Sequence, residues 1–564
     1  MSEAHEARSP RCANDAPQYS DAPTAEKGRR IMRLRIVRIC VAAAVLASGH
    51  AYGQDEASAF VPSSRCIACH SQLTSSTGQD VSIGIEWRAT IMANSARDPY
   101  WHAAVRREVT DHPAAQAAIE DTCSTCHMPM ARFDAVAAGG QGQVFANLPA
   151  AAPQHELAAD GVSCTVCHQI SAENLGEHAS FDGGFKIEAA SEGRVAFGPH
   201  DVDAGRQALM RSAATLKPNA GTHIQQSELC ATCHTLFTAA LDDAGVEVGS
   251  LPEQVPYQEW LHSDYRETNS CQSCHMPEVA GEAPITSVLG QPRPNVSRHT
   301  FLGANAFMLD ILRRNRGELG VKALPQELEA QAAEIRRFLG SRAAALTIAT
   351  AQRTADGVEL ALDVTSTTGH KLPTAYPARR AWLHVVVRDA AGRVVFESGA
   401  ARPDGSIAGN DNDADGARFE PHYDVVTSPD EVQIYEAIMV DSRDAVTTGL
   451  LKGVRFIKDN RLPPRGFNKL TAEPDFAVRG AAADDANFVG GADRVSYRVA
   501  LPAGVAAPLT VEAELEYQSI GYRWAENLRG YGAAETERFG RYYAENAAAS
   551  AVVIATAAAT IAAR

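Results

Sequence analysis

The sequence predicts a multidomain chain: a mainly helical and irregular region, then a short helical segment, then a C-terminal β-sandwich of the immunoglobulin-like kind. Three observations predict this order. Ten of the twelve cysteines fall in five closely spaced pairs before residue 275. Apolar residues then follow a helical period, and from about residue 346 the period becomes two. We divide the 564 residues into 1–53, 54–300, 301–345 and 346–564.

Residues 32–54, MRLRIVRICVAAAVLASGHAYGQ, have the parts of a secretory signal peptide. A stretch with three arginines precedes an apolar stretch too short for a membrane span, and small residues near Gly53 offer a cleavage site. The polar residues before Met32 show no periodicity, so either Met32 is the true start or the leader has a long first part. We predict that residues 1–53, with Cys12 and Cys40, are removed on export to the periplasm or the cell surface.

The five cysteine pairs share one form, Cys-x-x-Cys-His. They read CIACH (66–70), CSTCH (123–127), CTVCH (164–168), CATCH (230–234) and CQSCH (271–275). This form is the attachment pattern of a c-type haem, in which the thiols form thioethers and the histidine binds the iron. A zinc site of four thiolates needs no histidine after each pair, and a disulfide framework would not confine every spacing to two residues.

The sequence therefore predicts a multihaem cytochrome c domain over 54–300 with five haems c. The predicted thioether cysteines are Cys66, Cys69, Cys123, Cys126, Cys164, Cys167, Cys230, Cys233, Cys271 and Cys274. The predicted proximal iron ligands are His70, His127, His168, His234 and His275. Because packed haems replace side chains in such an interior, we expect little sustained periodicity here.

Eleven further histidines outside the leader offer a second axial ligand to these irons. Local context favours five of them as distal candidates: His155, His200, His223, His299 and His370. His370, in TTGHKLPTAYP, follows a strand, and its turn-rich neighbourhood could project it from the β-sandwich into the haem region. His102, His178 and His262 are reserves, His384 and His422 are interpreted as structural, and nothing singles out His112.

Methionines that directly follow proximal histidines, such as Met128 and Met276, are too close in sequence to reach the other face of the same haem. We interpret them as packing residues. Ligand type matters because a methionine ligand raises the haem potential relative to histidine. A mostly bis-histidine set therefore predicts low-potential haems.

The segment 301–345 is predicted to be helical, and the region after it to be built of strands. Strands are predicted at 358–364, 381–389, 393–398, 494–501 and 509–517, followed by a polar helix at 533–546. The alanine-rich tail 547–563 is barely long enough to span a membrane, and alanine contributes little insertion energy. We expect a final strand there, with a helix as the alternative, and no transmembrane anchor.

An acidic segment, GNDNDADG at 409–416, offers a possible calcium site. Asp411, Asp413 and Asp415 alternate before Gly416 as at the start of a calcium loop. The twelfth position, where such a loop has glutamate, is His422. A solvated acidic turn is the favoured alternative.

The charge balance excludes some partners and favours others. The net charge is -16, which argues against a nucleic-acid binder, because such binding needs clustered lysine and arginine. Removal of residues 1–53 leaves 44 basic against 63 acidic residues, a net charge of -19. The negative electrostatic field of such a chain favours a redox partner protein with a basic docking surface. No catalytic triad, phosphate loop or nicotinamide fingerprint is evident.

With these motifs in view, region 60–300 resembles the bacterial multihaem cytochromes c, a broad group with tetrahaem nitrifier carriers, pentahaem nitrite reductases and hydroxylamine oxidoreductase. The resemblance lies in DGVSCTVCHQI, SELCATCH, YQEWLHSDY and SCQSCHMP. It implies an electron carrier or an oxidoreductase of small nitrogen or sulfur compounds. The nitrite reductases have a lysine in place of one proximal histidine, whereas all five motifs here end in histidine.

The leading hypothesis is an exported electron carrier. The alternative is a multihaem oxidoreductase with one open haem iron that binds a small nitrogen or sulfur compound. A third hypothesis is a structural subunit of a larger exported electron conduit.

Overall fold

The computed structural model describes residues 58–187 and 194–563. Residues Ala59–Arg564 form one unit, distinct from Met1–Ser58. The predicted signal peptide lies outside the described residues, so its cleavage and the loss of Cys12 and Cys40 stay predictions. Within the described ranges, no helix combines the length and apolar character needed to cross a bilayer.

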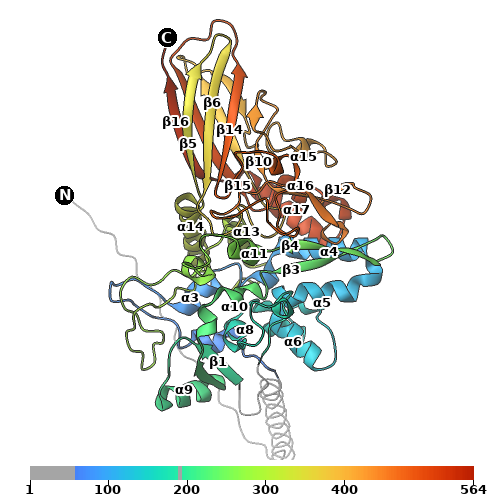
Figure 1. Ribbon diagram of the computed structural model, residues 1–564. Helices are drawn as coiled ribbons and strands as arrows, with labels where there is room; N and C mark the ends of the chain where they lie inside the picture. Colours follow the sequence, from blue (N-terminus) through green and yellow to red (C-terminus); the bar gives the residue numbers. More distant parts are fainter. Residues whose placement is uncertain (1–57, 188–193, 564) are drawn as a thin grey trace, which may run out of the picture. The chain divides into compact units, whose positions relative to one another are not determined.

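The motif-bearing region is built mainly of short helices separated by irregular segments, as predicted (Figure 1). The helices are α2 (Ser63–Ile67), α3 (Ile83–Arg88), α4 (Pro99–Asp111), α5 (Gln116–His127), α6 (Pro129–Ala137), α7 (His155–Ala159), α8 (Cys164–Gln169), α9 (Ala204–Ala214), α10 (Ser227–Ala231), α11 (Pro256–Leu261) and α12 (Cys271–His275).

The same region also holds two small sheets that the sequence did not predict. Strand β1 (Arg194–Gly198) pairs in parallel with β2 (Leu216–Ala220), and β3 (Leu236–Leu241) pairs antiparallel with β4 (Glu247–Gln254). The interpretation of this region as mainly helical and irregular therefore holds, but it did not include these two sheets. The β1–β2 pair has α9 between its strands, so its pairing is non-local and leaves no local periodic signal.

Two helices follow the motif region, α13 (Ala306–Arg314) and α14 (Pro325–Arg342), which confirms the helical prediction for 301–345. On α13 the apolar residues Phe307, Met308, Ile311 and Leu312 are all buried. In Figure 1 these helices lie between the motif helices and the strands of the sandwich. They therefore cover the base of the sandwich.

The C-terminal region contains two larger sheets and a small third one. The first sheet has the order β5 (Ala344–Arg353), β6 (Gly357–Ser366), β14 (Ala492–Ala500), β9 (Val425–Val426). The second has the order β10 (Ile434–Tyr435), β7 (Arg380–Arg388), β15 (Leu509–Gln518), β16 (Ala551–Ile561), and β8 (Val394–Ser398) also pairs with β7. The third joins β12 (Val446–Thr447), β11 (Ala437–Val440) and β13 (Arg455–Asp459).

The predicted strands are confirmed in place, although β7 is buried at nearly every position and does not alternate. Burial alternates along β14 and the first half of β15, as a half-buried sheet requires. The tail also forms a strand, because β16 pairs antiparallel with β15 along its length. Helices α15 (Asp411–Ala414), α16 (Tyr522–Glu526) and α17 (Ala534–Asn546) complete the region, and α17 confirms the predicted polar helix. The immunoglobulin-like type stays a prediction, and the parallel β9–β14 pair departs from an all-antiparallel sandwich.

The largest hydrophobic core runs through all three predicted parts of the chain. It joins Ala103 of α4 to Leu309 of α13, to Leu328 of α14 and to strand residues such as Val495 and Leu515. The domain boundaries at 300 and 345 stay predictions, but the parts they separate share this one core.

Candidate haem-binding sites

Each cysteine motif folds as a helical turn, which gathers its reactive groups on one side. Three motifs lie wholly within helices, in α5, α8 and α12. In the other two, the N–H groups of His70 and His234 donate to the carbonyls of Cys66 and Cys230, four residues earlier. Residues three and four apart share a helix face. Both thiols and the histidine of each motif can therefore reach one planar group, and the ten described cysteines are all free thiols.

The rings of four proximal histidines are oriented by hydrogen bonds to backbone carbonyl groups. The Nδ1–H of His70 donates to the carbonyl of Ile285 at 2.6 Å. In the same way His127 donates to Ser95 at 3.2 Å, and His168 donates to Phe197 at 2.6 Å. His275 donates in the same way to Leu302. Such second bonds fix the tautomer and leave Nε2 for a metal. The ring of His234 has a different partner, the Gln254 side chain.

The motifs touch one another in an order that differs from their order in the sequence. Thiol groups of different motifs lie close enough to shift each other's pKa, namely Cys66 with Cys164, Cys126 with Cys233, and Cys230 with Cys271. Cys167 is also close enough to Cys233 for their charges to interact. The first motif thus meets the third and the third approaches the fourth. The fourth meets both the second and the fifth.

Two proximal histidines face a second histidine ring. The ring centres of His168 and His299 are 6.4 Å apart with 15° between planes, and those of His275 and His370 are 6.1 Å apart with 14°. A metal held at about 2 Å from one nitrogen of each ring would keep the ring centres roughly 6 Å apart. Both pairs therefore have the spacing of two axial ligands on one iron, and both combine a predicted proximal with a predicted distal residue.

Protein bonds hold His299 in its position. Its backbone N–H donates to Glu86 at 2.8 Å, and the neighbouring Arg298 bridges Glu86 and Glu334. Burial lowers the pKa of His299 to about 3, so the ring is neutral, the form that binds a metal.

A buried ionic network holds His370 against the motif region. The backbone N–H of the next residue, Lys371, donates to Glu259 of α11 at 3.0 Å, and its ammonium group lies 2.7 Å from Asp459. Arg461 connects Asp459 to Glu259. The His370 Nδ1–H donates to a backbone carbonyl, which leaves Nε2 free. The segment after β6 therefore reaches into the motif region, as the sequence suggested.

The structure does not bring the other three distal candidates opposite a proximal ring. His155 donates from Nδ1 to Asn147 at 2.9 Å and keeps Nε2 free. His223 uses Nε2 for Ile170 at 2.9 Å, which leaves only Nδ1 for a metal. His200 is half-buried, and burial lowers its pKa. Their ligand roles stay predictions.

The reserve candidates and the two histidines interpreted as structural differ in exposure and in the hydrogen-bond partners of their rings. His102 donates from Nε2 to Ala96 at 2.9 Å and accepts from Arg538 at Nδ1, so neither nitrogen is free. His178 and His262 are exposed. His384 and His422 have carboxylate or amide partners on both nitrogens.

One buried histidine was not singled out from the sequence. His112, at the end of α4, is 1% exposed, and neither of its ring nitrogens has a hydrogen-bond partner. Its neighbours in sequence, Asp111 and Pro113, suggest an ordinary helix end. Only the burial of the ring distinguishes it.

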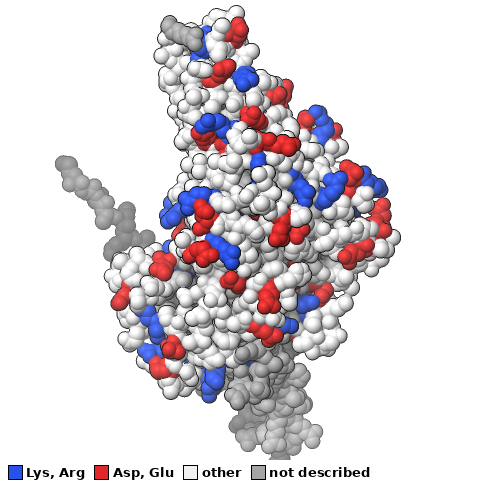
Figure 2. All heavy atoms as spheres, viewed as in Figure 1, with Lys and Arg blue, Asp and Glu red and all other residues white. Residues whose placement is uncertain are grey.

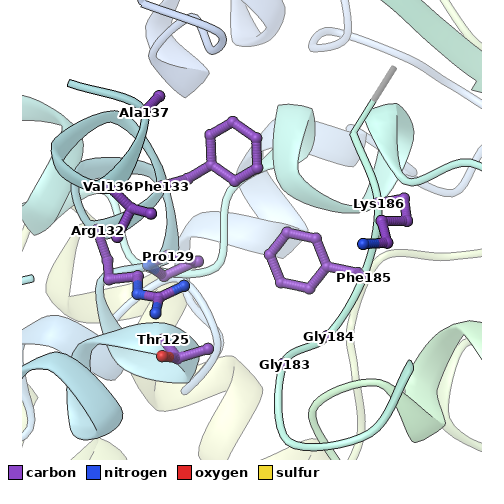
Figure 3. A pocket seen from close by; sticks show the side chains of 10 residues that line it. All are labelled: Thr125, Pro129, Arg132, Phe133, Val136, Ala137, Gly183, Gly184, Phe185 and Lys186. Carbon is purple, nitrogen blue, oxygen red and sulfur yellow. The ribbon is translucent and has the colours of Figure 1, made fainter. Parts of the chain in front are cut away.

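A pocket of about 280 Å³ opens beside the second motif (Figure 3). Thr125, which lies between the two motif cysteines, forms one wall, and the rings of Phe133 and Phe185 lie on either side of the space. Arg132 and Lys186 add positive charge at its edge. The pocket therefore suits an apolar or anionic group close to Cys126.

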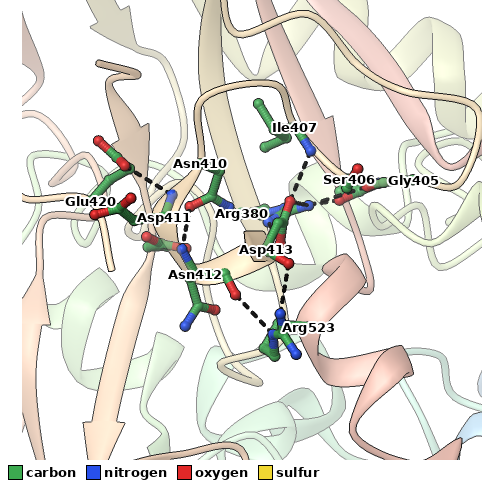
Figure 4. A network of polar contacts seen from close by, with 12 residues as sticks. Arg380, Gly405, Ser406, Ile407, Asn410, Asp411, Asn412, Asp413, Glu420 and Arg523 are labelled. Carbon is green, nitrogen blue, oxygen red and sulfur yellow. Dashed lines mark hydrogen bonds and ion pairs between the residues drawn. The ribbon is translucent and has the colours of Figure 1, made fainter. Parts of the chain in front are cut away.

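The acidic segment, offered as a possible calcium site, forms a short helix whose carboxylates have protein partners (Figure 4). Asp411–Ala414 is the short helix α15, and residues two apart on a helix do not face each other. Asp413 is buried and pairs with both terminal nitrogens of Arg380, at 2.8 and 2.9 Å. Asp411 pairs with Arg418, and Asp415 accepts from the backbone of Ala417. The three carboxylates thus have separate protein partners, and calcium binding at this segment stays a prediction.

Comparisons with known proteins give one informative result. No protein-family model matches the chain, and no curated protein matches it. A solved structure, the "Crystal structure of a penta-heme cytochrome c552 from Thermochromatium tepidum", is similar with a TM-score of 0.51 and 16% identity, covering 89% of this chain and 99% of that chain. At this identity the likeness concerns the fold, which supports the predicted multihaem cytochrome fold. The narrower group named above is not tested by it.

Proposed function

We propose that the chain is an exported electron-transfer protein with five covalently bound haems c, most of them held by two axial histidines. A bound haem c supplies reversible one-electron exchange at its iron.

The contacts among the cysteine motifs carry this proposal. Cys66 with Cys164, Cys126 with Cys233, and Cys230 with Cys271 bring the attachment points of different motifs together. Groups attached there would be neighbours, so single electrons could pass among all five. The fourth motif, CATCH, touches two others and approaches a third, which makes it the branch point of this path.

The ring pairs support low-potential haems. His168 with His299 and His275 with His370 offer two imidazole ligands each. No methionine is needed at these two positions, and imidazole in place of thioether keeps the potential low. The residues around these rings are therefore suited to electron storage and transfer at low potential.

Export and the partner are inferred from the sequence. Residues 32–54 have the pattern of a signal peptide, and the mature chain would carry a net charge of -19. On the face shown in Figure 2, acidic and basic side chains are interspersed. We infer that the electron donor and acceptor are redox proteins, of which at least one has a basic docking surface.

Low-temperature EPR with optical spectroscopy on the oxidised holoprotein tests the proposal. We expect five low-spin haems whose spectra do not change when cyanide or nitrite is added. A preparation without covalently bound haem would contradict it.

The second candidate is an oxidoreductase with one open iron. His70, His127 and His234 face no second histidine ring within the described chain, and the pocket beside Thr125 carries Arg132 and Lys186. An open position next to a cationic pocket would suit a small oxyanion. In the same EPR experiment, a high-spin signal that shifts with nitrite would favour this candidate over the carrier.

A further inference from the structure

We propose that three side chains on the second sheet of the sandwich, His384, Glu514 and Glu516, form a binding site for one zinc ion. The site is separate from the cysteine motifs and goes beyond the proposed electron transfer. Its ligands come from two strands that are distant in sequence, so no short motif marks it in the chain.

The pairing of β7 with β15 places the three ligands beside one another. His384 of β7 is the direct cross-strand partner of Glu514 on β15. Glu516 follows two residues later, so its side chain leaves β15 on the same face as that of Glu514. Side chains on paired strands are held more precisely than side chains on loops. The sheet therefore presents one imidazole and two carboxylates together.

The three donor atoms have the spacing of a tetrahedral metal site. Nδ1 of His384 lies 3.2 Å from a carboxylate oxygen of Glu516 and 3.5 Å from one of Glu514. All three donor atoms lie within 4.8 Å of one another. Nitrogen and oxygen ligands at about 2.0–2.2 Å from a tetrahedral Zn²⁺ are roughly 3.3–3.6 Å apart. Small side-chain movements would thus bring all three atoms onto one ion, with the fourth position left to water.

A fourth carboxylate, from Glu397 of β8, orients the His384 ring for this role. The Nε2–H of His384 donates to Glu397 at 3.0 Å. A carboxylate on the far nitrogen fixes the tautomer of a metal-bound histidine and makes the ring a stronger ligand. The bond leaves Nδ1 facing the two glutamates of β15.

A second group of this kind in the described part of the chain, His422 with Asp485 and Asp493, lacks such an arrangement. Nδ1 of His422 accepts N–H groups from the side-chain amides of Gln433 and Asn460. The oxygens of both amides accept from backbone N–H groups, which fixes their orientation. The neutral ring of His422 therefore carries its proton on Nε2, the nitrogen that faces the aspartates. Only the His384 group has its metal-facing nitrogen available.

The negative charge around His384 exceeds the positive charge that the ring can carry. Glu397, Glu514 and Glu516 supply three negative charges, whereas a protonated imidazole supplies one positive charge. In the described ranges, none of the three glutamates pairs with a lysine or an arginine. Without a metal the ring holds a proton between the carboxylates, and a divalent ion would replace that proton and add positive charge. The side chain of Glu514 is 39% exposed, so an ion can enter from solvent.

The experiment titrates ZnCl₂ into the chelator-treated holoprotein and measures the dissociation constant by calorimetry and the bound zinc by elemental analysis. The holoprotein is used because unattached Cys-x-x-Cys-His motifs would themselves bind zinc. We expect one zinc ion per chain in the wild type. Binding should weaken by about 100-fold or more in His384→Gln and Glu514→Gln, and by about 10- to 100-fold in Glu397→Gln, which only loses the bond that orients the ring.

Glu512→Gln is the matched control on β15. Glu512 lies two residues before Glu514, is 54% exposed and pairs with Arg388. This variant should bind zinc as the wild type does. A wild-type holoprotein that binds no zinc, or binding that both His384→Gln and Glu514→Gln leave unchanged, would overturn the inference. If His384→Gln does not accumulate, Glu514→Gln decides alone. The haem spectrum should not respond to zinc, so either outcome leaves the proposed electron transfer to be tested separately.

Discussion

At the scale of single residues, the partners of the ring nitrogens separate histidines that can bind a metal from those that cannot. His102 is buried and His370 is half-buried, yet His102 has partners on both nitrogens and His370 keeps one free. Sequence context ranked His370 well because its neighbourhood is rich in turns. It could not rank His112, because nothing near His112 in sequence reports the burial of its ring.

Replacing His370 by alanine should change the ligation of one haem in five. The ring of His370 faces His275, and its loss would leave that iron with one protein ligand. We expect one low-spin EPR signal to be lost with haem content unchanged. His384→Gln, in the sandwich and away from any facing proximal ring, should leave the spectrum as in the wild type. An unchanged spectrum in His370→Ala would show that the sandwich region supplies no ligand here.

Asp413 is expected to act as the partner of a buried arginine and not as a calcium ligand. Asp413→Asn leaves Arg380, which is 4% exposed, without its countercharge. Such a loss lowers the free energy of unfolding by about 3–5 kcal/mol. Asp415→Asn, at an exposed position, should change it by no more than about 0.5 kcal/mol. Denaturant titrations measure both values. A rise in stability with added calcium, abolished by Asp415→Asn, would restore the calcium hypothesis.

At the scale of strands and helices, local periodicity predicted most of the C-terminal region. Strands β6, β14 and β15 are each at least nine residues long and bury mainly one face over much of their length, so a period of two is visible in the sequence. Strand β7 is buried on both faces and is recognised instead as a mostly apolar run. The parallel pair β1–β2 was missed because its strands are five residues long and separated by a helix. Length alone did not decide the outcome, because the five-residue β8 was predicted and the ten-residue β5 was not.

The β7–β8–β15 surface should make stability depend on pH through His384. Glu397 of β8 and Glu514 and Glu516 of β15 lie within 3.0–3.5 Å of its ring. Hydrogen bonds and charge from Glu516 and Glu397 outweigh burial and raise the pKa of His384 to about 9. A raised pKa in the folded state gives stability that is complete below about pH 6.5 and is lost as the pH rises through about 9.

The measurement is the melting temperature between pH 6 and 9.5 for the wild type and His384→Gln. We expect the difference between them to shrink as the pH rises and to be smaller at high salt, because Glu397 and Glu514 are 41% and 39% exposed. A difference that does not vary with pH would show that the ring is not protonated in the folded state.

At the scale of the whole molecule, one core joins the motif region to the sandwich. Ala103, Leu309, Leu328 and Val495 belong to the same buried cluster, and the network of Glu259, Lys371 and Asp459 crosses the same boundary. When regions share one hydrophobic core, unfolding of one region removes the core contacts of the other. The predicted parts are therefore expected to unfold as one.

Unfolding of the holoprotein by denaturant should give coincident transitions for the haem absorption and for the far-ultraviolet circular dichroism. Coincidence of probes is the test of two-state behaviour. A haem transition that precedes the loss of β-structure would show that the motif region and the sandwich are independent domains, in line with the boundaries read from the sequence.

The sequence by itself was enough to predict the attachment motifs and their proximal histidines, because the two thiols and the imidazole of each motif are neighbours on one helical turn. It also determined the long strands and helices, whose buried faces repeat along the chain. The sequence offered five candidate second histidines, and the tertiary structure brought two of them, His299 and His370, opposite a proximal ring. The contacts among motifs and the partners of Asp413 were decided only by the tertiary structure. In each case the interacting groups come from distant segments, and their meeting depends on how the shared core brings those segments together.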